Sequence, residues 1–311
     1  MSWIAVAVAA YLLLAVANLL DKFLVDNVLK SGKAYAFTVC IFGLVVFLAA
    51  PWFLYWPGWA LFFFNIVNGV IFACALWSLY EALRRGEASR VLVLIGGSVP
   101  VFSLIFSSLF FKEQFTVNQW LGMAALFAGI LIIAFLPVSR SYLARVFHKF
   151  KLTPDFKTGG LGIALLSALA YSLYFISTKQ AYANQPFASA FIWTRLGAAL
   201  AVLPFLFQRF DRNAIRAVFC KSSPNKNKFL VIFNQAVGSI GFVLQNYAIF
   251  LGSVVLVNAL QGIQYAFLLI ISAILAILAP KLLKETFSLR IVLQKTAAVA
   301  AIAIGLYLIT L

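Results

Sequence analysis

Acidic residues, histidine and cysteine are scarce in this sequence. Its 311 residues include 8 Asp and Glu, 3 Cys and a single histidine, His148. No spacing among these residues matches a set of metal ligands, a disulfide framework, or a nucleophile beside its general base. We therefore expect no metal site, no cofactor and no enzymatic activity.

Charge is also scarce, and it is uneven in sign. Charged residues make up 10% of the chain, whereas soluble domains contain about 25%. The formal net charge is +16, but the basic residues lie in short connections between apolar runs. They form no basic stripe and no nucleic-acid-binding motif. The sequence therefore disfavours both a soluble domain and a nucleic-acid partner.

Long apolar sequence is what the chain has in abundance. Hydrophobic residues make up 64% of it, and they form ten runs close to the roughly 20 residues that span a bilayer. A span in lipid is helical because only a helix satisfies every backbone group within one segment. The sequence predicts an all-α, multi-pass membrane protein with ten transmembrane helices, at residues 3–20, 35–56, 59–83, 91–111, 118–137, 159–178, 187–208, 229–250, 255–279 and 290–310.

The chain divides into two similar halves. Residues 1–137 hold the first five runs, residues 138–158 form a basic linker, and residues 159–311 hold the other five. The halves share an order of features: Tyr80, Gly86, Gly96 and Lys112-Glu113 in the first correspond to Tyr247, Gly252, Gly262 and Lys284-Glu285 in the second. Because five is odd, two sequential copies must run through the membrane in opposite directions, which predicts two inverted five-helix repeats.

This combination resembles the drug/metabolite transporter superfamily. The segment Tyr80–Ile133, with Pro100 inside its apolar run, resembles an EamA-type repeat. Lys22, Lys179 and Arg195 also resemble family positions. The first half has no arginine matching Arg195, and the second has no proline matching Pro100. The resemblance implies two five-helix repeats with a substrate site between them, and it leaves the substrate subgroup open.

Basic residues indicate the orientation. Connections on one side of the predicted bundle carry 20 of the 24 Lys and Arg, whereas the other side carries Lys112 and Lys179. Since basic loops favour the cytoplasm, we expect the basic loops, including 138–158, to be cytoplasmic and both termini to lie outside. Many relatives are described with cytoplasmic termini, but twenty basic residues against two favour the orientation with both termini outside. We expect the protein in the cell membrane.

Polar residues inside apolar runs are the candidates for a substrate site. Arg195 lies near the middle of its run, where it either is satisfied by helix-end carbonyls or anchors an anionic substrate group. Polar stripes recur on four of the predicted helices, and they favour a shared polar cavity over helix packing alone. The candidate substrate-binding residues are Arg195, Asn68, Tyr80, Ser103, Asn234, Gln235, Gln245, Tyr247, Asn258, Gln261, Gln264 and Tyr265.

Other charges near the spans receive secondary roles. Lys295 lies inside the last apolar run, where snorkelling to the interface competes with ligand binding. Glu81 is a possible proton relay, but Arg84 and Arg85 at i+3 and i+4 favour a helix-end ion pair. Every acid lies in a loop or about one turn from a helix end. We therefore expect weak or absent proton coupling, with facilitated diffusion or exchange.

These features predict a secondary transporter or exporter of small metabolites that works by alternating access. Amino-acid-like or other anionic and zwitterionic solutes are the expected substrates, and the small molecule and the lipid bilayer are the expected partners. Drugs or sugar phosphates, carried by the same fold, remain an alternative. A lipid-modifying membrane enzyme and a non-transporting scaffold or receptor are alternatives from other classes.

Overall fold

The computed structural model describes residues 2–24, 31–85, 88–134, 159–219, 225–278 and 289–310. The basic linker 138–158, Gly86 and the segment 279–288, which contains the Lys284-Glu285 pair, lie outside these ranges. Throughout the described ranges the regular structure is helical. The protein is an all-α membrane protein, as its composition predicts.

The first half contains α1 (Trp3–Leu24), α2 (Gly32–Phe42), η2 (Gly43–Ala49), α3 (Ala50–Phe53), α4 (Trp59–Arg85), α5 (Ala88–Phe110) and α6 (Val117–Ala134). The second half contains α8 (Gly159–Asn184), α9 (Phe187–Val202), η3 (Leu203–Phe207), α10 (Arg209–Phe219), α11 (Asn225–Leu251), α12 (Val254–Ala259), α13 (Gln261–Leu278) and α14 (Leu289–Thr310). Six described stretches are long and apolar enough to cross a membrane, and shorter apolar helices accompany them. The number of crossings, ten, stays a prediction.

Prolines explain why two predicted runs are divided. The run that begins in α2 tightens into the 3-10 helix η2 just before Pro51, and η3 carries Pro204 in its first turn. A proline lacks the backbone N–H and its ring clashes with the carbonyl one turn earlier, so a 3-10 turn relieves the conflict. In α5, by contrast, the helix continues through Pro100.

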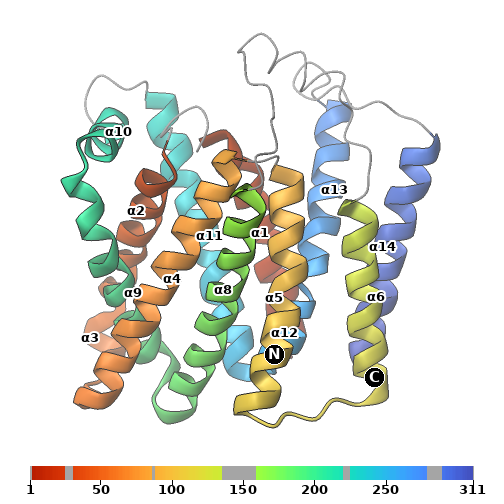
Figure 1. The fold of residues 1–311 in the computed structure, drawn as a ribbon, viewed down its shortest axis with the longest axis horizontal. Coiled ribbons are helices and arrows are strands. Elements are labelled where there is room, and N and C mark those ends of the chain that lie inside the picture. The colour runs from red at the N-terminus through yellow and green to blue at the C-terminus, as the bar shows by residue number, and fades with distance from the viewer. Residues whose placement is uncertain are drawn as a thin grey trace.

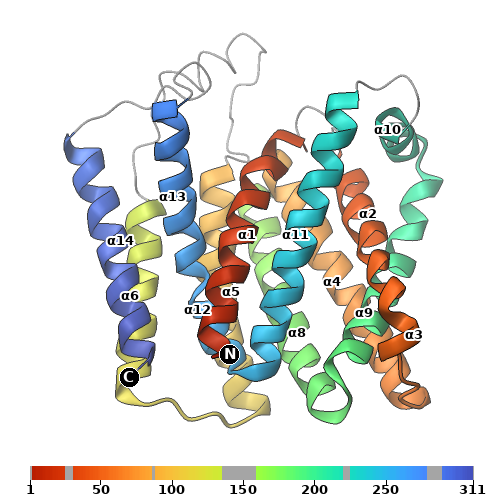
Figure 2. The ribbon, with the colours of Figure 1, turned by 180° about the vertical axis from the view of Figure 1, so that it is seen from behind.

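The helices form one bundle in which the two halves interleave (Figures 1 and 2). α1 of the first half packs along α11 and α13 of the second. Correspondingly, α8 of the second half packs along α4 and α5 of the first, and α6 packs along α14. The contacts of α1 with α11 and α13 thus have the same pattern as the contacts of α8 with α4 and α5.

α4 and α9 cross so closely that their backbones are in contact. A Cβ on Gly69 would lie 2.3 Å from the carbonyl oxygen of Thr194, and a Cβ on Gly197 would lie 2.4 Å from that of Ile66. Only hydrogen in place of a side chain allows this approach, as in other closely packed membrane helices. The crossing fixes the part of α9 that carries Arg195.

Large apolar side chains cover the outside of the bundle. Leu48, Val117 and Phe207 each expose more than 70% of their surface. A soluble monomer rarely exposes so much contiguous apolar area. This surface suits the hydrocarbon core of a bilayer.

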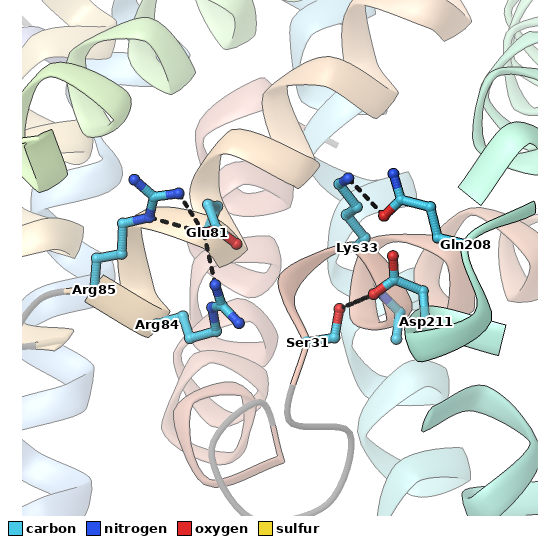
Figure 3. A network of polar contacts seen from close by, with 8 residues as sticks. Ser31, Lys33, Glu81, Arg84, Arg85, Gln208 and Asp211 are labelled. Carbon is cyan, nitrogen blue, oxygen red and sulfur yellow. Dashed lines mark hydrogen bonds and ion pairs between the residues drawn. The ribbon is translucent and has the colours of Figure 1, made fainter. Parts of the chain in front are cut away.

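The two termini lie at one end of the bundle, and α10 lies across the other end (Figure 1). At that second end, Ser31 at the start of α2 donates to Asp211 of α10 at 2.5 Å, and Lys33 donates to Gln208 at 2.9 Å. Figure 3 shows both contacts beside the end of α4. They hold the short amphipathic helix α10 against the bundle.

Candidate functional site

Arg195 lies inside the bundle among aromatic rings. Its side chain is 5% exposed. The guanidinium carbon lies 4.1 Å from the ring centre of Phe72 on α4, 4.6 Å from that of Phe191 on α9 and 4.7 Å from that of Phe242 on α11. Ring faces attract a cation while they exclude water. Two halves of the chain therefore enclose this charge.

The guanidinium is only partly hydrogen-bonded. Its Nη2 donates to the Tyr174 hydroxyl at 2.8 Å, whereas Nε is buried and has no partner. The ion pairs of the described residues join Glu81 with Arg84 and Arg85, and none of them involves Arg195. A buried donor without a partner costs about 1–3 kcal/mol. Arg195 thus presents an unused donor in an apolar enclosure.

A second set of side chains holds Tyr174 in place. The hydroxyls of Tyr174 and Tyr182 both donate to Asn246 Oδ1 at 3.0 Å, and Asn246 Nδ2 donates to the carbonyl of Phe242 at 2.9 Å. These bonds tie α8 to α11. Asn246 was not among the predicted site residues, although an asparagine in an apolar run was a usable signal.

Asn68 lies on α4 at the crossing with α9. It is 1% exposed, and neither Nδ2 nor Oδ1 has a hydrogen-bond partner. Phe72 follows it by four residues and so lies on the same helix face, one turn closer to the guanidinium. One turn in the other direction, Asn65 and Gln185 form a reciprocal amide pair at 3.0 and 3.2 Å. Asn68 is therefore a buried, unsatisfied polar group one helix turn from Phe72, whose ring contacts the Arg195 guanidinium.

Another polar cluster surrounds Asp21 on α1. Asp21 accepts hydrogen bonds from Tyr35 on α2, from Tyr80 on α4 and from Asn234 on α11. Tyr35 and Tyr80 pack edge to face, with ring centres 4.5 Å apart. Tyr80 and Asn234 were predicted site residues, whereas Asp21 and Tyr35 were missed.

The two clusters lie at different depths. Along α4, Tyr80 of the Asp21 cluster follows Phe72 of the Arg195 enclosure by eight residues, and along α11 Phe242 follows Asn234 by eight. At 1.5 Å per residue, both helices separate the clusters by about 12 Å along the bundle. The negative group is nearer the end where α4 finishes.

Polar contacts also join α5 to α12. Asn258 Nδ2 donates to Ser103 Oγ at 2.9 Å, and Asn258 Oδ1 is buried without a partner. The helix breaks just after this contact, at Leu260 between α12 and α13. Gln245 donates weakly to the Tyr11 hydroxyl, at 3.4 Å, and Tyr11 in turn donates to the Val257 carbonyl at 2.7 Å.

The remaining predicted residues whose side chains the structure describes make no hydrogen bond to these clusters. Tyr247 is 37% exposed and packs against Phe187 and Phe250 at the outside of the bundle. Gln235 and Gln264 are buried and Gln261 is half-buried, while the side chains of Tyr265 and Lys295 lie outside the described set.

Two other charges have structural partners. Glu81 accepts from Arg84 at 3.0 Å and from Arg85 at 2.7 Å, which is the helix-end ion pair that their spacing favours (Figure 3). Lys179 Nζ donates to the carbonyl oxygens of Ile249, Phe250 and Gly252 and so caps the end of α11. The side chain of its counterpart Lys22 lies outside the described set.

An apolar groove of about 200 Å³ lies between α5 and α6, with Pro100, Trp120, Met123 and Phe127 among its lining. Its lining carries almost no polar surface, so it differs from the polar cavity that the stripes predict. Within the described residues, no three His, Cys, Asp or Glu side chains gather as metal ligands would.

Known proteins resemble this chain. Residues 1–135 match the EamA-like transporter family. A curated relative, the "Uncharacterized transporter YdfC" of Bacillus subtilis (strain 168), is 30% identical over 141 residues, which are 43% of this chain and 42% of that protein. The match thus spans less than half of the relative. A solved structure, titled only "Crystal structure of protein", covers 98% of this chain and 94% of its own with a TM-score of 0.63 and 17% identity, and it shares the fold.

Proposed function

We propose that the protein moves a small anionic or zwitterionic solute across a membrane, on the premise that residues 1–135 match the EamA-like transporter family. It does so by alternating access between two inverted five-helix halves, residues 1–137 and 159–311, joined by the linker 138–158. The protein is a transporter and not an enzyme.

The packing between the halves supports this architecture. α1 on α11 and α13 is the counterpart of α8 on α4 and α5. Two inverted copies related by an axis in the membrane plane would make these pairs equivalent. Rocking one half against the other would then open the path between them toward each side in turn.

The observation that carries the proposal is the incomplete coordination of Arg195. A guanidinium without a carboxylate partner is expensive in a low-dielectric interior. A substrate carboxylate or phosphate would accept from its free Nε, with charge-assisted bonds about twice as strong as neutral ones. The aromatic rings of Phe72, Phe191 and Phe242 would strengthen that attraction because they keep water away.

Asn68 supports the zwitterionic form of the proposal. Its Nδ2 offers a second donor for the anionic group, and its Oδ1 offers an acceptor for an ammonium group. An amino-acid-like solute would use both at once. A sugar phosphate would use the donors and leave the carbonyl to a hydroxyl group.

The orientation of the protein in the membrane is part of the same proposal. The basic loops would face the cytoplasm, so that α10 lies at the cytoplasmic surface of the cell membrane and both termini lie outside. The exposed basic residues at the end of α4, Arg84 and Arg85, would then meet anionic lipid headgroups.

Uptake by the purified full chain in proteoliposomes tests the function. The library should contain amino acids, other carboxylates, sugar phosphates, and neutral compounds of similar size, and empty liposomes serve as the control. We expect transport of a carboxylate- or phosphate-bearing compound and little transport of its neutral amide or ester. Transport confined to neutral or cationic compounds would contradict the proposed substrate class.

A further inference from the structure

Asp21 is a buried carboxylate that the sequence analysis left without a role. It lies on α1 within a turn of the helix end. Packing by other helices leaves it 8% exposed. Its surroundings therefore decide what it does.

The three hydrogen bonds to Asp21 come from neutral groups. Oδ1 accepts from the Tyr35 hydroxyl at 2.5 Å and from Asn234 Nδ2 at 2.6 Å, and Oδ2 accepts a weak bond from the Tyr80 hydroxyl at 3.4 Å. The ion pairs of the described residues do not include Asp21. Among the described residues, Oδ1 thus has two close donors, while Oδ2 has only a long contact.

Asn234 supplies a second, independent observation. Its Oδ1 is buried and has no hydrogen-bond partner, although its Nδ2 bonds both to Asp21 and, at 2.8 Å, to the Tyr35 hydroxyl. An amide that donates to one oxygen of a carboxyl group through the N–H cis to its own carbonyl presents that carbonyl to the other oxygen of the same group. A proton on the other carboxyl oxygen would supply the donor that this carbonyl lacks.

We infer that Asp21 is a proton-binding site, in which the bound proton lies on Oδ2 and is donated to Asn234 Oδ1. Uptake of one proton converts the carboxylate to a neutral acid, and its release restores the charge. The site would couple proton movement to substrate transport. That coupling rests on the proposed function, whereas proton binding itself does not.

No described cation faces the site from the packed helices. The titratable groups around Asp21 are Tyr35 on α2 and Tyr80 on α4, and Tyr171 on α8 lies within electrostatic range. α11 contributes the amide of Asn234. Glu81, Arg84 and Arg85 at the end of α4 are paired with one another.

The state of Asp21 affects the contact between the halves. Its bonds join α1, α2 and α4 to α11, and bonds to a charged acceptor are roughly twice as strong as bonds to a neutral one. Protonation therefore weakens the bonds that Tyr35 on α2 and Tyr80 on α4 donate to Asp21, and it adds a bond from Asp21 to Asn234 on α11. This inference replaces our expectation of weak or absent proton coupling, which considered only the distance of each acid from a helix end.

Infrared difference spectroscopy of the purified full chain between high and low pH tests the site without any substrate. Wild-type protein should gain the carbonyl band of a protonated carboxylic acid at low pH. All eight Asp and Glu contribute to that band once they are protonated, so Asp21→Asn should remove one component of it, whereas Glu81→Gln, which changes an exposed ion pair, should keep that component. A band of unchanged intensity and shape in Asp21→Asn would overturn the inference.

Two further variants keep the test decisive if Asp21→Asn does not fold. Tyr35→Phe removes a donor that favours the carboxylate, so the band should grow in at higher pH than in the wild type. Asn234→Ala removes the acceptor, so the band should move to higher frequency. Unchanged spectra in both variants would contradict the inferred bonds, and loss of the band on adding Na⁺ at constant pH would assign the site to a metal cation instead.

Discussion

Gly69→Ala perturbs the contact on which the Arg195 enclosure depends. The added Cβ would lie 2.3 Å from the carbonyl oxygen of Thr194, 2.4 Å from the nitrogen of Ala198 and 2.6 Å from the carbonyl carbon of Gly197. Favourable contacts between heavy atoms lie at about 3.5–4.0 Å. All three obstacles are backbone atoms, so α4 and α9 must move apart by about 1 Å.

The magnitude follows from two opposing effects. Overpacking typically lowers the free energy of unfolding by about 1–3 kcal/mol. Because the obstacles here are rigid backbone atoms, we expect a loss of about 3 kcal/mol. Alanine gains up to about 1 kcal/mol over glycine in helix propensity. The net loss is about 2 kcal/mol, which for a chain of 311 residues corresponds to a fall of roughly 3 °C in melting temperature.

Thermal unfolding of detergent-solubilised protein measures this effect. Gly162→Ala on α8 is the matched control, because no atom lies within 4 Å of its added Cβ, and it should leave the melting temperature unchanged or raise it. Gly197→Ala should resemble Gly69→Ala, since its Cβ meets Ile66. The double variant should lose less than the sum, because one separation of the helices relieves both clashes. A Gly69→Ala protein as stable as Gly162→Ala would refute the backbone crossing.

Three other perturbations test separate parts of the account. Tyr174→Phe removes the partner of Arg195 Nη2 and should cost about 2 kcal/mol of stability in detergent, whereas full stability would mean that the bond is not made. Lys179→Met uncaps α11 and should also lower the melting temperature, but transport selectivity should be unchanged, and altered selectivity would place Lys179 in the site. Membrane-impermeant thiol reagents added outside cells should label cysteines introduced at Trp56–Gly58 and leave those near Lys149 unlabelled; the reverse pattern would invert the proposed topology.

The sequence predicted the helices well because lipid imposes a simple rule. Long apolar runs must be helical in a bilayer, and the observed helices follow the predicted runs. The divisions of the runs 35–56 and 187–208 were not predicted, since they depend on how the chain relaxes around Pro51 and Pro204. Arg195, Asn68 and Asn234 were identifiable because a polar residue deep in an apolar run needs a reason to be there.

The missed and misplaced residues show what one sequence lacks. Asn246 and Tyr247 are neighbours, yet the first is buried in the Tyr174 network and the second is 37% exposed. Successive helical residues differ by about 100° in direction, so an error of one position changes the face. Asp21 was missed because its burial comes from α2, α4 and α11, whose packing no local pattern reveals.

Transport by Arg195 variants tests the central claim most directly. Wild type, Arg195→Lys and Arg195→Ala, each reconstituted as well-folded protein, are compared with a carboxylate substrate and its neutral amide analogue. We predict that Arg195→Ala loses most transport of the carboxylate and little of the amide. Arg195→Lys should recover only part, because lysine lacks the bidentate fork. Equal losses for both compounds would show that Arg195 does not hold the substrate's anionic group.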